Sequence, residues 1–380
     1  MPRPVAHSVQ RTPGALCIAH VNSERGFSGG EVQVLLLLEG LRKLGHQPVL
    51  FCPPKSRSFE EAVRRNLPVV ATRMRNDFDW PAIVALVRGF RHCGADLVHL
   101  HTGRANWLGG LAAWLVGLPA ITTRRMDRVV KRNWRTRLIY RHLVQRALPI
   151  SPAVAACLIE GGVPAERIAL IAEGVDPRQL QPRAGREETR AARGATADEH
   201  VLLALSALVH RKGLDVLLEA LALLAADGLP ATLWIAGDGP ERATLAAHAA
   251  RLGLDRHVQF LGQRQDGPDL LAACDVFVMP SRREGLGVAA LEAMAAGRPV
   301  VCSAVGGLTF SVVDGRTGLL VPPDDPRALA AAIARLLRDD ALRHRLGAAG
   351  PGRIAEGFLT EQVVAAHEQL YRTVLREWKA

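Results

Sequence analysis

The sequence predicts an α/β protein made of two doubly wound domains, each with a parallel sheet. Three observations support this prediction: short apolar runs alternate with helix-length segments, a polar stretch interrupts the alternation, and the alternation then restarts. At 380 residues the chain has room for two domains of ordinary size. Short strands separated by helices of ten or more residues imply parallel βαβ units with helices on both faces of each sheet.

The first half of the chain supplies the strands of the first predicted sheet. They are expected at residues 15–21, 48–52, 97–102, 120–124, 146–151 and 167–175. A helix is expected from about Gly30 to Leu44. The apolar stretch 105–121 is barely long enough to span a membrane, and Pro119 interrupts it, so we expect a buried helix that leads into a buried strand.

The polar, charged segment 176–200 is the best candidate for a linker between the domains. The second sheet is expected to contain strands at 201–208, 231–237, 258–263, 276–281, 299–303 and 317–323. The last segment has apolar residues at helical spacing and is expected to form a final helix at about 360–380.

Composition limits the classes of protein that need to be considered. Hydrophobic residues make up 48% of the chain and charged residues 22%, as in ordinary globular proteins. The six cysteines form no C-x-x-C pair, which argues against a zinc site or a disulfide framework and fits a reducing compartment. The first 14 residues lack the apolar core of a secretory signal, so we expect a cytoplasmic protein.

The net charge of +11 is concentrated in one run, residues 124–146, which holds nine Arg or Lys residues and the single acid Asp127. Such a run attracts phosphate-bearing partners such as anionic lipid, a phosphorylated glycolipid or nucleic acid, although a solvated basic helix face is an equal alternative for any one residue. Only Trp134 and Tyr140 interleave aromatic character, which disfavours RNA. The candidate membrane or acceptor patch comprises Arg124, Arg125, Arg128, Lys131, Arg132, Arg135 and Arg137.

Ligands of open α/β sheets bind beyond the carboxyl ends of the strands, so the loops there carry the candidate site residues. In the first domain, Gly29 and Gly30 open a helix, where free N–H groups suit an anion or where glycine only shapes a turn. His99 and His101 lie on one face at a strand end, either as hydrogen-bonded structural residues or as site residues.

In the second domain, Arg211 and Lys212 precede a helix, where two cations suit a diphosphate but a solvated basic pair is also possible. The stretch Pro280–Ser303 holds Glu284 in a glycine-rich loop and Glu292 on the helix expected at 288–295. From the residues alone, these carboxylates form an acid/base pair as in glycoside hydrolases, two ligands for one elongated substrate, or a solvated helix edge.

The string Asp77–Asp79 has the D-x-D pattern that holds Mg²⁺ or Mn²⁺ in some nucleotide-sugar enzymes. It directly precedes a helix with Pro81 in its first turn, so we interpret it as a helix cap instead. No metal ligand is therefore predicted.

Taken together, the motifs resemble those of the GT-B retaining glycosyltransferases of family 4. The stretch "REGLGVAALEAMAAGRPVV" is similar to the E-x7-E signature of that family, and "FSGGEVQVLLLLEGLRKLGHQPVLF", "DLVHLH", "RKGLDVLLEAL", "WIAGDGPER" and "DGRTGLLVPPDDPRALAAAI" occur in the family's order over nearly the whole chain. The resemblance implies an acceptor domain at 1–178, with the last helix packed back on it, and a donor domain at 179–359.

The resemblance also implies the activity, which is retaining transfer from a nucleoside-diphosphate sugar without a metal or other cofactor. His101, Lys212 and Glu284 would be the catalytic residues: His101 lines the reacting face, Lys212 neutralises the diphosphate, and Glu284 binds sugar hydroxyls. The donor would further contact a set shared between the two domains: Gly29, Gly30, Arg211, Gln263, Arg264, the N–H groups of Gly285, Leu286, Gly287 and Val288, and Glu292 on the ribose.

The expected acceptor is a lipid-linked glycan, lipopolysaccharide or surface polysaccharide, reached at the inner face of the cytoplasmic membrane. Two alternatives are an epimerase or phosphorylase on the same fold and a non-catalytic nucleotide-sugar binding protein. The chain departs from the family pattern at three places: Ala207 stands for an arginine, Thr309 and Phe310 for Pro-Glu, and Glu173 for an asparagine.

Overall fold

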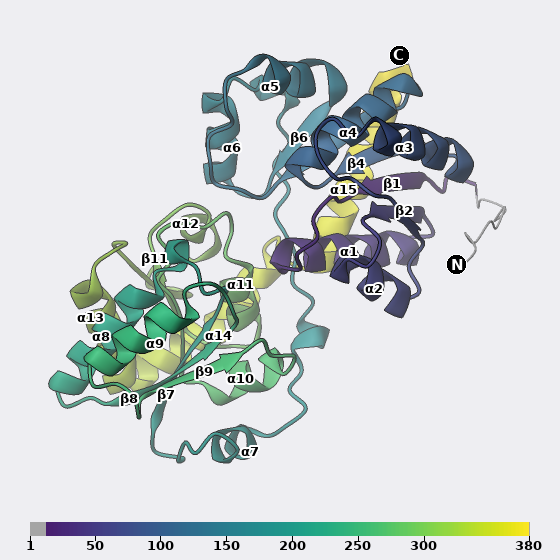
Figure 1. Cartoon of the computed structure of the whole chain (residues 1–380). Helices are drawn as coiled ribbons and strands as arrows, with labels where there is room; N and C mark the ends of the chain where they lie inside the picture. The colour runs from purple at the N-terminus through teal and green to yellow at the C-terminus, as the bar shows by residue number, and fades with distance from the viewer. Residues whose placement is uncertain (1–12, 380) are drawn as a thin grey trace. The chain divides into compact units, whose positions relative to one another are not determined.

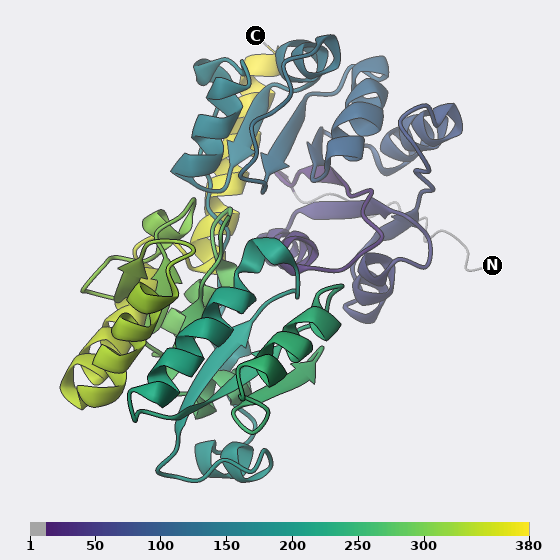
Figure 2. The same cartoon turned by 60° about the vertical axis from the view of Figure 1, so that its left-hand side comes forward.

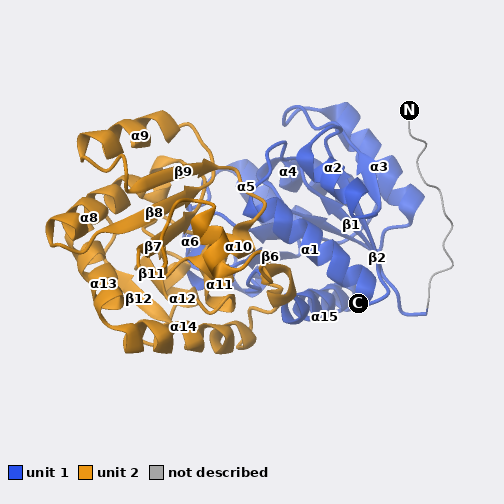
Figure 3. Ribbon diagram, turned by 90° about the horizontal axis from the view of Figure 1, so that it is seen from below, with its two compact units in different colours: residues 1–173, 360–380 blue, residues 174–359 orange. Residues whose placement is uncertain are grey.

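The structure, a computed structural model, describes residues 13–379 and divides them into two units (Figure 3). Unit 1 comprises the chain up to Glu173 and the segment from Thr360 onward, and unit 2 comprises Gly174–Leu359. Residues 1–12 lie outside the described residues, and with them lies most of the segment that lacks a secretory signal pattern.

Unit 1 is built on a six-stranded parallel sheet (Figure 1). Its strands are β1 (Cys17–Val21), β2 (Gln47–Cys52), β3 (Val69–Ala71), β4 (Leu97–Leu100), β5 (Ala120–Arg124) and β6 (Arg146–Pro149). Their order in the sheet is β3-β2-β1-β4-β5-β6, so the direction of winding reverses between β1 and β4. Ligands of doubly wound folds bind at this reversal.

Helices cover both faces of this sheet. They are α1 (Gly29–Lys43), α2 (Arg57–Arg64), α3 (Trp80–Cys93), α4 (Gly103–Leu115), α5 (Trp134–Leu138), the π-helix η1 (Ile139–Leu143), α6 (Pro152–Glu160), the 3-10 helix η2 (Ala165–Arg167) and α15 (Thr360–Lys379). On one face, α1 and α15 form a core cluster with Ile18, Leu97 and Ile121. The chain thus returns at its end to pack a helix on the first sheet, and Figure 2 shows α15 (yellow) running along that sheet.

Unit 2 repeats the arrangement. Its strands are β7 (His200–Leu205), β8 (Ala231–Ala236), β9 (Val258–Gly262), β10 (Val276–Met279), β11 (Val300–Ser303) and β12 (Gly318–Val321), in the order β12-β11-β10-β7-β8-β9. All pairings are parallel, and the winding reverses between β7 and β10.

The helices of unit 2 are η3 (Pro177–Leu180), α7 (Arg186–Ala191), η4 (His210–Lys212), α8 (Leu214–Ala226), α9 (Arg242–Arg251), α10 (Gly267–Ala273), α11 (Val288–Ala295), α12 (Leu308–Ser311), α13 (Pro326–Arg338) and α14 (Asp340–Ala355). The main core of the unit joins α8 and α13 to the sheet through residues such as Leu217, Leu233 and Ile333.

The predicted fold class is therefore confirmed, and two local predictions are wrong. No strand forms at 167–175: Ala169 and Ile171 donate to the carbonyl oxygens of Ala147 and Pro149, but Pro149 has no N–H to donate in return, so the ladder stops at an isolated bridge. The segment 176–200 is no free linker either, because the guanidinium of Arg190 in α7 is buried and bonded to Asp275 and to the carbonyl oxygen of Ala273.

The apolar stretch 105–121 forms most of α4 and the first residues of β5, as expected for a buried helix leading into a strand. Among the described residues, no helix is both long enough and apolar enough to cross a membrane.

Candidate active site

Two of the predicted site residues of unit 2 lie beyond the carboxyl ends of β7 and β10, the two strands where the winding reverses. Lys212 is the last residue of η4, which follows β7, and Glu284 lies in the loop that follows β10. The two side chains form an ion pair, with 2.5 Å between Lys212 Nζ and Glu284 Oε2. Each side chain is little more than a tenth exposed, so the pair is largely shielded from water.

Glycines allow the chain segments around Glu284 to approach one another. Gly213 follows Lys212 with φ +64°, and a Cβ atom there would lie 2.0 Å from the carbonyl oxygen of Pro280. Gly306 has φ +50°, and its Cβ would lie 2.1 Å from the carbonyl oxygen of Glu284. That same oxygen accepts a hydrogen bond from the N–H of Gly307 at 2.8 Å. Larger residues at these positions would push the Glu284 loop away from Lys212.

A row of unbonded N–H groups lies beside this ion pair. The backbone N–H groups from Gly285 to Ala289, at the start of α11, donate no hydrogen bond within the described part of the chain. Gly287 precedes the helix with φ +86°, a conformation that turns the chain into the helix start. Free N–H groups and the positive end of the helix dipole make this turn suitable for a phosphate or sugar oxygen.

Glu292 lies on α11, one turn beyond that row. Its carboxyl group accepts no hydrogen bond from the described residues, and burial raises its pKa to about 7. Glu292 is half-buried, and a partly desolvated carboxylate without a donor is costly, so this position favours a ligand that brings hydroxyl groups. Glu284 and Glu292 therefore occupy different surroundings, one paired with a cation and one unpaired.

Arg282 holds the Glu284 loop against the Lys212 turn. Its guanidinium donates two hydrogen bonds to the Asp215 carboxylate, at 2.8 and 2.6 Å, and one to Asp324 at 2.5 Å. It also donates to the carbonyl oxygen of His210 at 2.8 Å. Burial alone would raise the pKa of Asp215, but the bonds and charge of Arg282 hold it below its usual value. No local sequence pattern indicates this role for Arg282, since its pairing with Asp215 spans 67 positions.

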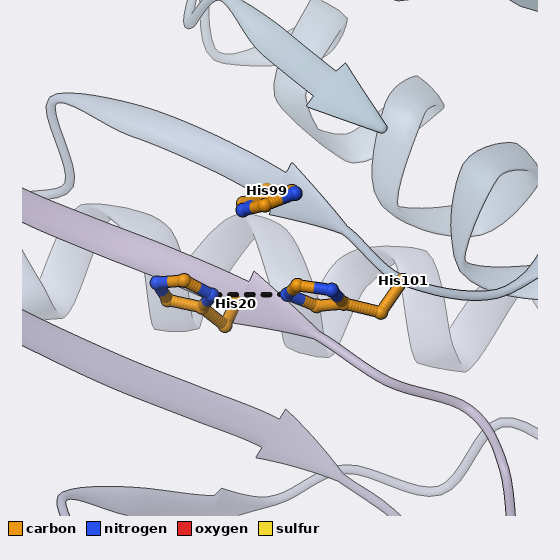
Figure 4. Close-up of side chains that lie close together, drawn as sticks. All are labelled: His20, His99 and His101. Atoms are coloured by element: carbon orange, nitrogen blue, oxygen red, sulfur yellow. Dashed lines mark hydrogen bonds between the residues drawn. The ribbon is translucent and has the colours of Figure 1, made fainter. Parts of the chain in front are cut away.

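Unit 1 contains a cluster of buried histidines at the ends of β1 and β4. The facing ring nitrogens of His20 and His101 lie 3.0 Å apart, and Figure 4 shows the two rings end to end with His99 beside them. His99 is hydrogen-bonded on both sides, to Tyr371 of α15 at 2.8 Å and to Thr123 at 2.7 Å. Burial lowers the pKa of His20 to about 3, so that this ring is neutral.

One nitrogen from each of His20, His99 and His101 lies within 4.8 Å of the others, a spacing that a metal centre would also show. Metal binding needs a lone pair directed at the ion from each ring. Both nitrogens of His99 are already bonded to hydroxyl groups, and the facing nitrogens of the other two rings bond to each other. The histidines therefore form a hydrogen-bonded network rather than a set of converging ligands.

The start of α1 lies in the same unit and is packed against an arginine. A Cβ atom on Gly30 would lie 3.1 Å from Cδ of Arg125, so glycine makes room for that side chain. Arg125 in turn forms an ion pair with the buried Glu173. Glu173 is the residue that replaces the family's asparagine, so this departure has a partner in the structure.

The predicted basic patch separates into an exposed part and a paired part. Arg128, Lys131, Arg132 and Arg137 are exposed. Arg125 and Arg135 are instead held in ion pairs, with Glu173 and Asp77 respectively, and Arg124 donates to the carbonyl oxygen of Arg128. The nearby Asp79 accepts from the N–H of Ala82 and so caps α3, as the helix-cap interpretation expects.

The remaining predicted donor residues lie in exposed loops of unit 2. Arg211 is exposed, and its side chain has no ion pair in the described chain. Ala207, which lies just beyond the carboxyl end of β7, is also exposed. Gln263 and Arg264 follow β9, and Arg264 is paired with Asp266 at 2.6 Å.

Comparison with known proteins places these features in one class. Residues 27–179 match the family described as Glycosyltransferase Family 4, and residues 185–353 match Glycosyl transferases group 1. A D-inositol 3-phosphate glycosyltransferase of Corynebacterium urealyticum is 32% identical over 73% of this chain and 72% of its own length. The chain therefore belongs to glycosyltransferase family 4.

Other relatives agree in class but differ in extent. A lipopolysaccharide core biosynthesis glycosyltransferase of Rhizobium meliloti is 38% identical over 48% of this chain, a match that spans 52% of that relative. Among solved structures, Anabaena HepE in complex with UDP and glucose has a TM-score of 0.82 at 23% identity and covers 94% of this chain and 99% of its own. The predicted GT-B fold and the assignment as a glycosyltransferase are thus confirmed.

Proposed function

We propose that this enzyme transfers a sugar, with retention of anomeric configuration and without a metal ion, from a nucleoside-diphosphate sugar to a lipid-linked or surface-polysaccharide acceptor. The observation that carries the proposal is the arrangement in unit 2, where the Lys212–Glu284 ion pair adjoins unbonded N–H groups and the unpaired carboxyl of Glu292. A cation and N–H donors suit a diphosphate, and two separate carboxylates suit two sets of hydroxyl groups.

The proposed roles follow from these surroundings. Lys212, with Arg211 nearby in sequence, binds the donor diphosphate, and the N–H groups at the start of α11 bind its oxygens. Because Glu284 is then released from its cation, its carboxylate accepts hydrogen bonds from the donor sugar, while Glu292 accepts them from the ribose.

The reaction places charge where these groups lie. The bond between the anomeric carbon and the diphosphate oxygen breaks, positive charge develops on the sugar ring, and negative charge develops on the leaving diphosphate. Fixed donors aimed at the diphosphate stabilise that transition state. The acceptor hydroxyl forms the new bond from the same face, and its proton passes to the leaving diphosphate oxygen, so that no carboxylate nucleophile is needed.

UDP is the first nucleotide to test, because the Anabaena relative in the solved structure binds UDP and glucose. A panel of nucleoside-diphosphate sugars would be compared by thermal shift and by nucleotide release with and without a glycolipid acceptor. Stabilisation by one donor, with release that depends on the acceptor, supports the proposal. Stabilisation without any acceptor-dependent release would instead indicate an epimerase or a binding protein.

The proposal includes contact with the anionic inner face of the cytoplasmic membrane through the four exposed cations of the patch. Exposed apolar side chains accompany them: Trp134 is 69% exposed and Met126 is 50% exposed. Basic residues next to exposed aromatic and apolar side chains are typical of interfacial attachment. A two-signal surface of this kind binds reversibly and needs no spanning helix.

Charge reversal tests this contact directly. The triple variant Arg128→Glu, Arg132→Glu, Arg137→Glu is expected to lose most of its salt-sensitive binding to vesicles of phosphatidylglycerol and phosphatidylcholine. Its matched control, Lys43→Glu, Arg88→Glu, Arg91→Glu, changes the net charge equally at exposed positions elsewhere in unit 1. Equal vesicle binding by both variants would contradict a localised membrane surface.

A further inference from the structure

We propose that Arg125, held beside the start of α1 by Glu173, binds a phosphate group of a substrate. Neither the family match nor the sequence motifs assign a ligand role to this arginine, which the sequence alone grouped with the surface patch. The inference rests on the proposed function only in taking the substrates to carry phosphate.

The guanidinium of Arg125 is only partly engaged by the protein. The Arg125 side chain is only 19% exposed, and its Nε donates to the Glu173 carboxylate. Its two terminal nitrogens donate no hydrogen bond to any described residue, which leaves up to four N–H donors without an acceptor. The terminal nitrogens are not fully buried, so they are open to an anion that the protein itself does not supply.

The Arg125 side chain lies beside the start of α1. Arg125 lies against Gly30 in the first turn of α1, and the N–H groups of Gly29 and Gly30 have no acceptor within the described residues. Glu31, the acid in this turn, is engaged with the hydroxyl and N–H of Ser28, at 2.7 and 2.8 Å. The helix start and the guanidinium therefore offer positive potential and free donors at one place.

The histidine cluster of the same unit contains a further buried nitrogen without a partner. His101 is 5% exposed, and its Nδ1 has no hydrogen-bond partner although the other ring nitrogen bonds to His20. Burial, and then the charge of Arg125, hold the pKa of His101 well below its usual value. The neutral ring can donate from Nδ1 when its tautomer places the proton there.

Glu173 explains how the chain keeps a cation at this position before any ligand arrives. It neutralises the charge of Arg125 through Nε alone and leaves the two terminal nitrogens for a second anion. An asparagine, the residue found in the family pattern, could accept a hydrogen bond but would not offset the charge. The family's arginine near Lys212 is Ala207 here, so Arg125 adds a cation in unit 1 to a chain in which that arginine is replaced.

Two sources carry the required chemistry, namely the diphosphate of the donor and a phosphate group on the acceptor. The test uses the double variant Arg125→Gln, Glu173→Gln, which removes the cation and the charge of its carboxylate partner together. Glu173→Gln alone is the matched control for the partner, and Arg91→Ala is the control for a lost exposed arginine in unit 1. Urea unfolding of each variant confirms that the fold persists.

The donor arm compares UDP with uridine, which lacks the phosphates, by titration calorimetry. If Arg125 binds the donor diphosphate, the ratio of the two affinities falls about tenfold or more in the double variant, since hydrogen bonds to charged groups are strong. The acceptor arm measures the binding of inorganic phosphate to enzyme saturated with UDP. If Arg125 binds an acceptor phosphate, only this second affinity falls, by a similar factor.

An unchanged UDP-to-uridine ratio together with unchanged phosphate binding would overturn the inference and leave Arg125 as a structural ion pair. In that event only the unfolding free energy would respond to the variant. Failure of the proposed function gives a different result, because the wild-type enzyme would then show no acceptor-dependent release of nucleotide, whatever the two affinities of the variants.

Discussion

The half-buried Glu292 predicts that donor binding and stability oppose each other as the pH changes. Its pKa is raised from 4.5 to about 7 by burial. Between these two values the unfolded chain has lost the proton while the folded chain retains it. Stability therefore falls as the pH rises through this window, and the loss is complete above pH 7.

The size of the effect follows from the size of the shift. A change from 4.5 to about 7 corresponds to about 3 kcal/mol of unfolding free energy at pH 8. The variant Glu292→Gln has no charge to bury, so it is expected to become about 3 kcal/mol more stable relative to wild type at pH 8 than at pH 4.5. Urea unfolding at the two pH values measures this difference directly.

Donor binding is expected to change in the opposite sense. If ribose hydroxyls donate to the ionised carboxylate, wild-type affinity for UDP is about tenfold weaker at pH 6 than at pH 8. At pH 6 the carboxyl is protonated in most molecules and must lose its proton before it can accept these bonds. The Glu292→Gln variant is expected to bind UDP more weakly at pH 8 and to lose this pH dependence. A variant that binds UDP as well as wild type, or a stability difference that does not vary with pH, would refute the reasoning.

Three further predictions concern other groups. Lys212→Ala is expected to lower kcat about a hundredfold with a smaller change in KM, since the cation acts on the developing charge of the diphosphate; a change confined to KM would contradict this role. Arg282→Ala and Asp215→Ala should each lower kcat/KM about tenfold, and the double variant should lose little more, because both break one clamp; additive losses in a double-mutant cycle would show independent roles. Tyr371→Phe should cost about 1–3 kcal/mol in urea unfolding by leaving His99 Nδ1 without a partner, whereas a neutral result would mean that the ring finds another donor or acceptor.

Much of the fold could be predicted from the sequence because its strands are apolar and its helices are bounded by clear start signals. The helix expected at 288–295 forms over those residues, and the helix expected from about Gly30 begins at Gly29. The strand β3 was missed because it is only three residues long and lies at the sheet edge, where one strand pairing suffices. The strand expected at 167–175 does not form, because it would pair with β6 at Pro149, which has no N–H to donate. The apolar pattern of the segment does not show which residues it would pair with.

The candidate site was only partly predictable for a similar reason. Residues in loops that follow strands, such as Lys212 and Glu284, carry a local pattern. Partners far away in the chain do not: His20 pairs with His101 across 81 positions and Arg125 with Glu173 across 48. The run of basic residues also predicted a larger exposed patch than the structure has. The sequence does not reveal that Arg125 and Arg135 form ion pairs with acidic residues. The replacement of an asparagine by Glu173 was the one visible signal that an arginine is paired nearby.

The return of α15 to the first sheet has a consequence for how the protein is made. Tyr371, which bonds to His99, lies 272 positions after it. Unit 1 therefore lacks part of its core until the whole of unit 2 has left the ribosome, so synthesis order and domain order do not coincide. Unit 2 is continuous in sequence and can fold first, even though it is translated second. A stop codon in the last twenty residues would thus damage the domain encoded at the opposite end of the gene.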